Sequence, residues 1–70
     1  MAGESADAVQ KALNSLPPDY REAIILKHIE ELDYQTISEI LGVSIAALKV
    51  RTHRGRDMLK GLLERSGVTP

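Results

Sequence analysis

The 70-residue sequence contains no cysteine, no phenylalanine and no tryptophan. Without cysteine the chain has neither a disulfide framework nor a thiolate metal site, and an oxidising compartment is not indicated. Because two tyrosines are the only aromatic residues, the core has to be built from Leu, Ile, Val and Ala, a composition typical of small helical bundles. We therefore expect an all-α protein of the cytoplasm.

The sequence also lacks the features of a membrane protein or an enzyme. No apolar stretch approaches the roughly 18 residues of a membrane span, and the N-terminus lacks the basic and apolar regions of a signal peptide. A chain of this length forms one domain at most and has little room for a large cleft. No Ser-His-Asp set, phosphate loop or carboxylate pair can be placed on a concave scaffold of this size, and no second ligand lies at metal spacing from His28, so we expect no catalytic residue, no cofactor and no metal site.

The net charge of −1 conceals two halves of opposite sign. Residues 1–43 carry three basic and eight acidic side chains, a net charge of −5, which disfavours contact with nucleic acid. Residues 44–65 carry six basic and two acidic side chains, a net charge of +4. The positive charge is thus concentrated in one C-terminal segment, which is the candidate nucleic-acid surface.

Two helices are predicted in the first half of the chain. Apolar residues at steps of three and four predict a helix over about residues 5–14, which Pro17 and Pro18 prevent from continuing. Pro18 suits the first turn of a second helix, over about residues 18–31, where its missing N–H has no intrahelical partner. The apolar run 23–26 followed by Ile29 makes the face of this helix wide, so we expect it to be central.

The second half predicts a helix-turn-helix. Asp33 is a good N-cap for a helix over residues 34–41, and Gly42 can adopt the left-handed conformation that ends helices. Ser44 is a second N-cap candidate, so a further helix over residues 45–65 begins after a sharp corner. The expected fold is an all-α, four-helix domain with a C-terminal helix-turn-helix and no winged elements. Residues 66–70 show no periodicity and are expected to fray.

The last helix has an apolar stripe on one face and candidate DNA contacts on the other. A major groove about 12 Å wide admits one such helix, and its first turns meet the bases. Lys49 can donate to purine acceptors and Val50 can touch a thymine methyl, whereas the arginines are better placed for phosphates. The candidate DNA-binding residues are Ser44, Ala46, Ala47, Lys49, Val50, Arg51, His53, Arg54 and Arg56.

Three stretches of the chain resemble region 4 of the sigma-70 family, in particular its extracytoplasmic-function members. They are LPPDYRE at residues 16–22, LDYQTISEILGVS at 32–44 and LKVRTHRGR at 48–56, and the resemblance covers about residues 6–65. A glycine-turned helix-turn-helix alone occurs in many regulators. The leading Leu-Pro-Pro helix together with the Lys-x-Arg-x-x-Arg-x-Arg array is much more specific.

The resemblance implies a set of partners. Such a domain reads the upstream (−35) element of double-stranded promoter DNA, docks on the flap of the RNA polymerase β subunit and can be occluded by an anti-sigma factor. Region 2 of a complete sigma factor is absent, so residues 1–70 are expected to be a fragment of a longer sigma factor. The isolated domain is expected to be a monomer without a membrane partner.

Some residues depart from the family pattern. Ser38 and Gly55 stand where alanine is usual, and Thr52 stands where a large aliphatic residue is usual. A mid-helix glycine costs about 0.5 to 1 kcal/mol relative to alanine, so we expect a looser recognition helix. Ala46 and Ala47 replace a commoner Gly-Thr pair, which removes a hydroxyl donor and leaves the promoter preference open.

Several alternatives remain open from the residues alone. The basic run can be a solvated helix face, although acidic partners four residues away are mostly missing. His53 is either a base contact or an ordinary exposed histidine, and His28 fits a structural role. The run 24–26 is core or, in part, a groove for a partner helix. Rival functions are a response-regulator output domain, which dimerises on DNA, and a protein-interaction module that has lost DNA binding.

Overall fold

The computed structural model describes residues 2–65, with side chains described from residue 7 onward, and this part of the chain is helical without any strand. The elements are α1 (Ala2–Ser15), α2 (Pro18–Ile24), the π-helix η1 (Ile25–Ile29), α3 (Tyr34–Leu41) and α4 (Ile45–Arg65). The all-α class and the helix-turn-helix are confirmed, and no winged element is present among the described residues. The expected fraying of residues 66–70 lies outside this range.

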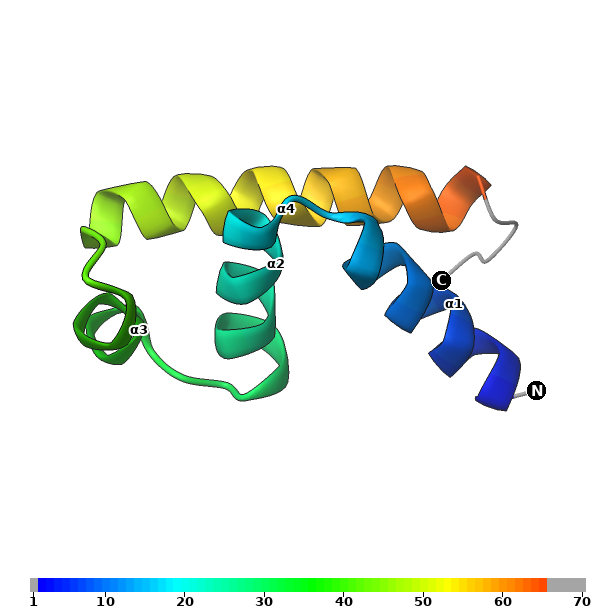
Figure 1. The fold of residues 1–70 in the computed structure, drawn as a ribbon, viewed down its shortest axis with the longest axis horizontal. Helices are drawn as coiled ribbons and strands as arrows, with labels where there is room; N and C mark the ends of the chain where they lie inside the picture. The colour runs from blue at the N-terminus through cyan, green and yellow to red at the C-terminus, as the bar shows by residue number, and fades with distance from the viewer. Residues whose placement is uncertain (1, 66–70) are drawn as a thin grey trace.

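Helix α4 is the helix against which the rest of the domain packs. It has 21 residues and lies along the long axis, with α1, α2 and α3 on one side of it (Figure 1). It packs against each of these three helices. Leu13 from α1, Leu16 from the bend that follows it and Ile24 from α2 form a buried cluster, against which Leu59 and Leu62 of α4 pack. Among the described helices, none combines the length and the hydropathy of a membrane span.

The corner between α1 and α2 is built by proline. Pro17 has extended backbone angles (φ −54°, ψ 144°) and occupies the N-cap position, and Pro18 is the first residue of α2. The backbone N–H of Arg21 donates to the Pro17 carbonyl at 2.9 Å. The guanidinium of Arg21 also donates to the Asn14 carbonyl of α1 at 3.3 Å. The Arg21 side chain thus ties the end of α1 to the start of α2, and the helix end and the helix start lie at the Pro-Pro pair as predicted.

The second predicted helix runs from Pro18 to Ile29 rather than to about residue 31, and its last five residues form the π-helix η1, which follows α2 without a break. The N–H of Glu30 donates to the Ile25 carbonyl at 2.9 Å, a spacing of five residues that makes a π turn. Glu31 then has a φ of 59°, which ends the helix. Because a π turn differs little from an α turn over five residues, apolar periodicity does not reveal it. Ile29, expected on the apolar face, is 56% exposed.

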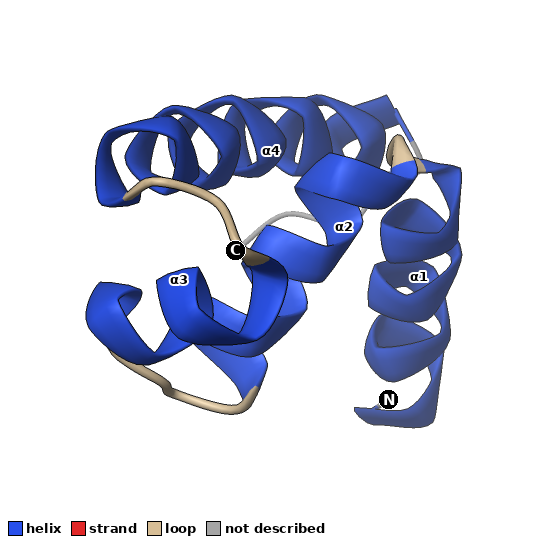
Figure 2. Cartoon of the chain, turned by 60° about the vertical axis from the view of Figure 1, so that its left-hand side comes forward, coloured by secondary structure: helices blue, strands red, loops and turns tan. Residues whose placement is uncertain are grey.

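The caps of the helix-turn-helix are those that the sequence predicted. The Asp33 carboxylate accepts the Thr36 N–H at 2.8 Å and caps α3. Gly42 is left-handed (φ 67°, ψ 32°) and ends that helix. The Ser44 hydroxyl accepts the Ala47 N–H at 3.2 Å and caps α4. The short loop between these caps turns α4 sharply away from α3 (Figure 2).

Gly55 and Thr52 have packing roles that the sequence analysis did not foresee. Both are buried on the inner stripe of α4. A Cβ at Gly55 would lie 2.9 Å from Cγ1 of Ile24 and 3.5 Å from Cβ of Tyr20, so the glycine permits the close approach of α2 to α4. The Thr52 hydroxyl lies 3.0 Å from the hydroxyl of Tyr34, the first residue of α3. The two residues thus join α4 to α2 and to α3.

Candidate nucleic-acid interface

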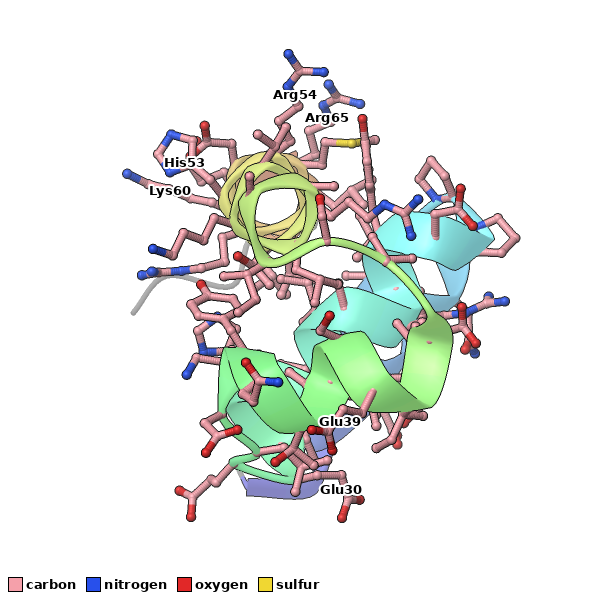
Figure 3. The ribbon with its side chains drawn as sticks, turned by 90° about the vertical axis from the view of Figure 1, so that its left-hand side faces the viewer. Glu30, Glu39, His53, Arg54, Lys60 and Arg65 are labelled. Atoms are coloured by element: carbon pink, nitrogen blue, oxygen red, sulfur yellow. The ribbon has the colours of Figure 1, made fainter. Side chains whose placement is uncertain are left out.

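The predicted recognition helix has the exposed basic face that DNA binding requires. Viewed along α4, the side chains of His53, Arg54, Lys60 and Arg65 project away from the other helices (Figure 3). Of the other candidates, Ser44, Ala46, Lys49, Val50 and Arg56 are exposed, while Ala47 and Arg51 are half-buried. The structure therefore brings most of the candidates together on the outer side of one helix.

The exposed cations of α4 form two groups. Residues at steps of three and four share one side of a helix, so Lys49, His53, Arg56 and Lys60 lie along one flank. Figure 3 shows His53 and Lys60 on this side, while Arg54 points to the top of the view. A helix inserted in a groove has a strand on each side of it. The flank with Lys49, His53, Arg56 and Lys60 and the side with Arg54 therefore suit contacts to different strands of DNA.

Two of the candidate residues lie within ion-pair distance of a carboxylate of the protein. A guanidinium nitrogen of Arg51 lies 4.0 Å from the Asp19 carboxylate on α2, and the Arg51 side chain is only 27% exposed. Nε2 of His53 lies 3.7 Å from the Asp57 carboxylate, with both side chains largely exposed. Ion pairs of this length near the surface are weak. Arg51 nevertheless points toward α2, apart from the outer group of cations.

Sequence reasoning missed Lys27 as part of the positive surface. The Nζ atom of Lys27 lies 4.5 Å from the ring centroid of Tyr34, and Nζ of Lys49 lies 5.9 Å from the same centroid. Both distances suit a cation–π contact. Lys27 belongs to the acidic half of the sequence, and only the fold brings it to α4. The local sequence contains no signal for this contact, because the loop at residues 30–33 separates the lysine from the tyrosine.

The pKa of His28 is lowered by burial and, to a smaller extent, by nearby positive charges. Partial burial lowers the pKa of His28 below its ordinary value of 6.5, and the nearby charges of Arg56 and Lys27 lower it further. Positive charges disfavour protonation of a neighbouring imidazole. Lys27 of η1 and Arg56 of α4 thus both act on His28, and Lys27 shares the Tyr34 ring with Lys49.

The opposite side of the domain is acidic and partly apolar. Glu30 and Glu39 lie on the side away from the projecting cations of α4 (Figure 3). Ile29 of η1 and Ile40 of α3 are each 56% exposed. Ile29 and Ile40 are sequence neighbours of Glu30 and Glu39, so exposed apolar and acidic side chains adjoin in both segments. Within the described part of the chain, no group of three or more metal-ligating side chains is placed to hold a metal ion.

Comparison with known proteins gives a consistent set of relatives. A family model described as "Sigma-70, region 4" matches residues 6–59. The chain is 46% identical over 55 residues to the ECF RNA polymerase sigma factor SigE of Mycolicibacterium smegmatis, covering 79% of the chain and 21% of that protein. It is 40% identical over 57 residues to the ECF RNA polymerase sigma factor SigW of Bacillus subtilis, covering 81% and 30%.

A third relative is the RNA polymerase sigma factor CarQ of Myxococcus xanthus, 40% identical over 52 residues, which cover 74% of the chain and 30% of that protein. The chain thus spans less than a third of the length of these relatives. No solved structure shows a significant match.

Proposed function

The chain belongs to the sigma-70 region 4 family, and from this premise we propose that it reads the upstream (−35) element of a promoter with α4 while bound to RNA polymerase. One observation carries the proposal: the Ser44 cap and the left-handed Gly42 direct a long helix out of a sharp corner, and its outer side is basic. A helix-turn-helix reader needs this layout, in which the preceding helix braces the inserted one.

The proposed DNA contacts divide by their position along α4. Lys49 and Val50 lie in the first turns, which reach the groove floor, so they are assigned to base edges. Arg54 and Arg56 lie further along and are assigned to phosphates. The complete proposed set keeps Ser44, Ala46, Ala47, Lys49, Val50, Arg51, His53, Arg54 and Arg56 and adds Lys27.

The protein partners are assigned to the side away from the cations. The exposed Ile29 and Ile40 beside Glu30 and Glu39 are suited to a partner with apolar and basic side chains. We assign this side to the flap of the RNA polymerase β subunit, and we propose that an anti-sigma factor occludes the domain. Crosslinking from positions 29 and 40, with crosslinking from position 54 as the matched control, tests this division. Polymerase captured solely at position 54 would contradict it.

The DNA proposal is tested by selecting bound fragments from a random pool of double-stranded DNA with this chain attached to polymerase. A common element should emerge. The free domain has few phosphate contacts and should bind near the non-specific range, about 10⁻⁴ to 10⁻⁶ M. Nanomolar binding by the free domain in physiological salt, together with a dimer in sedimentation, would favour an output domain that dimerises on DNA. No binding even at low salt would leave a protein-interaction module.

A further inference from the structure

Thr52 is a polar side chain on the buried stripe of α4. Its side chain lies among packed helices with 3% of its surface exposed. Its hydroxyl oxygen lies 3.1 Å from the carbonyl oxygen of Lys49 and 3.0 Å from the hydroxyl oxygen of Tyr34. A buried hydroxyl needs such partners to offset its loss of water. The two contacts link α3 to the first turns of α4.

The number of hydroxyl protons decides which group donates in each of these two hydrogen bonds. A threonine hydroxyl has one proton, and here it donates to the Lys49 carbonyl at 3.1 Å. The second contact at 3.0 Å then requires Tyr34 to donate its own proton to Thr52. A chain of donors therefore runs from the Tyr34 hydroxyl through the Thr52 hydroxyl to the Lys49 carbonyl. The Tyr34 proton is used inside the protein and is not available to a ligand.

Tyr34 is linked to both the backbone and the side chain of Lys49. The donor chain terminates on the Lys49 backbone, and the Lys49 ammonium lies 5.9 Å from the centroid of the Tyr34 ring. Lys27 lies 4.5 Å from that centroid and adds a second cation against the ring. Tyr34 therefore contacts the charged end of Lys49 directly and its backbone carbonyl through Thr52.

We propose that Tyr34 and Thr52 are a positioning pair that fixes the direction of Lys49 and thereby sharpens base discrimination at the position it meets. This inference rests on the proposed reading role of α4. The pair does not itself touch DNA bases. It acts because a base contact distinguishes sequences only when its donor is held in a narrow range of orientations. A lysine without this support would remain a point charge near the phosphates.

The test removes the hydroxyls one at a time and measures base preference. The variants are Tyr34→Phe, Thr52→Val and the double variant, with Thr52→Ser to restore a hydroxyl and Tyr20→Phe as the matched loss of a phenol elsewhere. Tyr34→Phe keeps the ring against both lysines and removes only the donor. Each variant, attached to polymerase, is used to select bound fragments from a random pool of double-stranded DNA. Discrimination is the ratio of the affinity for the preferred duplex to the affinity for the mismatched duplex.

Tyr34→Phe and Thr52→Val should each reduce discrimination roughly two- to tenfold, the range that one net hydrogen bond supplies. The double variant should lose no more than either single variant, because both break one chain. Thr52→Ser and Tyr20→Phe should keep the discrimination of the parent. The salt dependence of affinity should not change, because no cation is removed. Additive losses, or full discrimination in Tyr34→Phe, would overturn the positioning role.

A measurement on the free domain separates this inference from the function on which it rests. The carbonyl ¹³C resonance of Lys49 should shift in Thr52→Val and in Tyr34→Phe but not in Tyr20→Phe, with circular dichroism showing that each variant is folded. An unchanged resonance in both would refute the donor chain whatever the DNA result. Conversely, a parent chain with no base preference and a shifted Lys49 resonance would refute the reading role of α4.

Discussion

At the scale of single residues, two glycines of α4 have opposite roles although the sequence presents them alike. Gly55 is buried where α2 crosses the helix, and a Cβ there would meet Ile24 at 2.9 Å. At Gly61 a Cβ would meet no heavy atom within 4 Å. The first glycine permits a helix contact, and the second only weakens the helix.

The pair Gly55→Ala and Gly61→Ala tests this difference. Gly61→Ala should stabilise the domain by about 0.5 to 1 kcal/mol through helix propensity. Gly55→Ala gains the same propensity but crowds Cγ1 of Ile24, a β-branched side chain that is stiff in a helix, and overpacking of this kind costs roughly 1 to 3 kcal/mol. Thermal unfolding should therefore show a higher Tm for the first variant and a lower one for the second. Equal increases in both would contradict the packing role of Gly55.

Glu31 is the one residue other than glycine that has a positive φ in the described part of the chain, at 59°. This conformation is costly for a residue with a Cβ, by roughly 1 kcal/mol. Glu31→Gly should accordingly raise the free energy of unfolding by somewhat less than that, since glycine also gains freedom in the unfolded chain. Urea denaturation measures the change.

The neighbouring residue supplies the control for Glu31. Glu30 has right-handed angles, φ −80° and ψ −14°, so Glu30→Gly should lower stability by removing helix preference without relieving strain. If Glu31→Gly were as destabilising as Glu30→Gly, the left-handed conformation would not exist in solution.

At the scale of elements, the cap of α3 connects local chemistry to pH. The backbone N–H of Thr36 donates to the Asp33 carboxylate and holds the pKa of Asp33 below its ordinary value of 3.8. A group with a lowered pKa in the folded state adds stability above its unfolded pKa and loses it as the pH falls through the folded one. The contribution of the charged cap is thus complete at neutral pH, begins to fall below about pH 3.8 and is lost as the pH passes the lowered pKa of the folded state.

Asp33→Asn tests the cap, because asparagine also caps helices and does not titrate. Its melting temperature should stay near that of the parent at pH 7 and should fall less than that of the parent between pH 4 and pH 2. Asp33→Ala, which cannot cap, should melt lower than both at pH 7. The three melting curves against pH give the answer, and identical acid slopes for the parent and for Asp33→Asn would disprove the assignment.

The ends of the helices could be predicted because they depend on residues that are close in the sequence. Pro18, Asp33, Gly42 and Ser44 act on backbone groups a few residues away, so their types alone located the helix ends. The π turn of η1 could not be predicted, because the spacing of apolar residues over five positions does not distinguish it from an α turn. Lys27 was missed for a related reason: its approach to Tyr34 depends on the path of a loop.

At the scale of the whole molecule, the candidate site was only partly visible in the sequence. The spacing of α4 identified its outer side correctly, because a single helix fixes which of its residues share a face. It did not show that Arg51 approaches Asp19 at 4.0 Å on α2, or that Thr52 bonds Tyr34. These are contacts between elements, and helical periodicity carries no information about them.

The placement of Lys49 and Arg54 predicts different effects on DNA binding. Lys49→Ala should change which base is preferred at one position, by about 1 to 3 kcal/mol of discrimination. Arg54→Ala should weaken all sequences alike and lower the slope of log affinity against log salt by about one unit, since one fewer counterion is released. Titrations of matched and mismatched duplexes at several salt concentrations measure both.

Circular dichroism first has to show that the Lys49 and Arg54 variants are folded. The opposite pattern, with uniform weakening from Lys49→Ala and an altered base preference from Arg54→Ala, would mean that α4 docks in another orientation.

The separation of cations from acids also affects how the domain meets DNA before any contact forms. The net charge is −1, so at long range the molecule as a whole is weakly repelled by a polyanion. Figure 3 shows the projecting cations of α4 on one side of the domain and Glu30 and Glu39 on the other. This separation of charge makes an electric dipole across the domain. In the field of a duplex such a dipole experiences a torque that turns α4 toward the phosphates. Diffusional encounters are thereby enriched in the productive orientation, and the association rate should fall as added salt shortens the range of this torque.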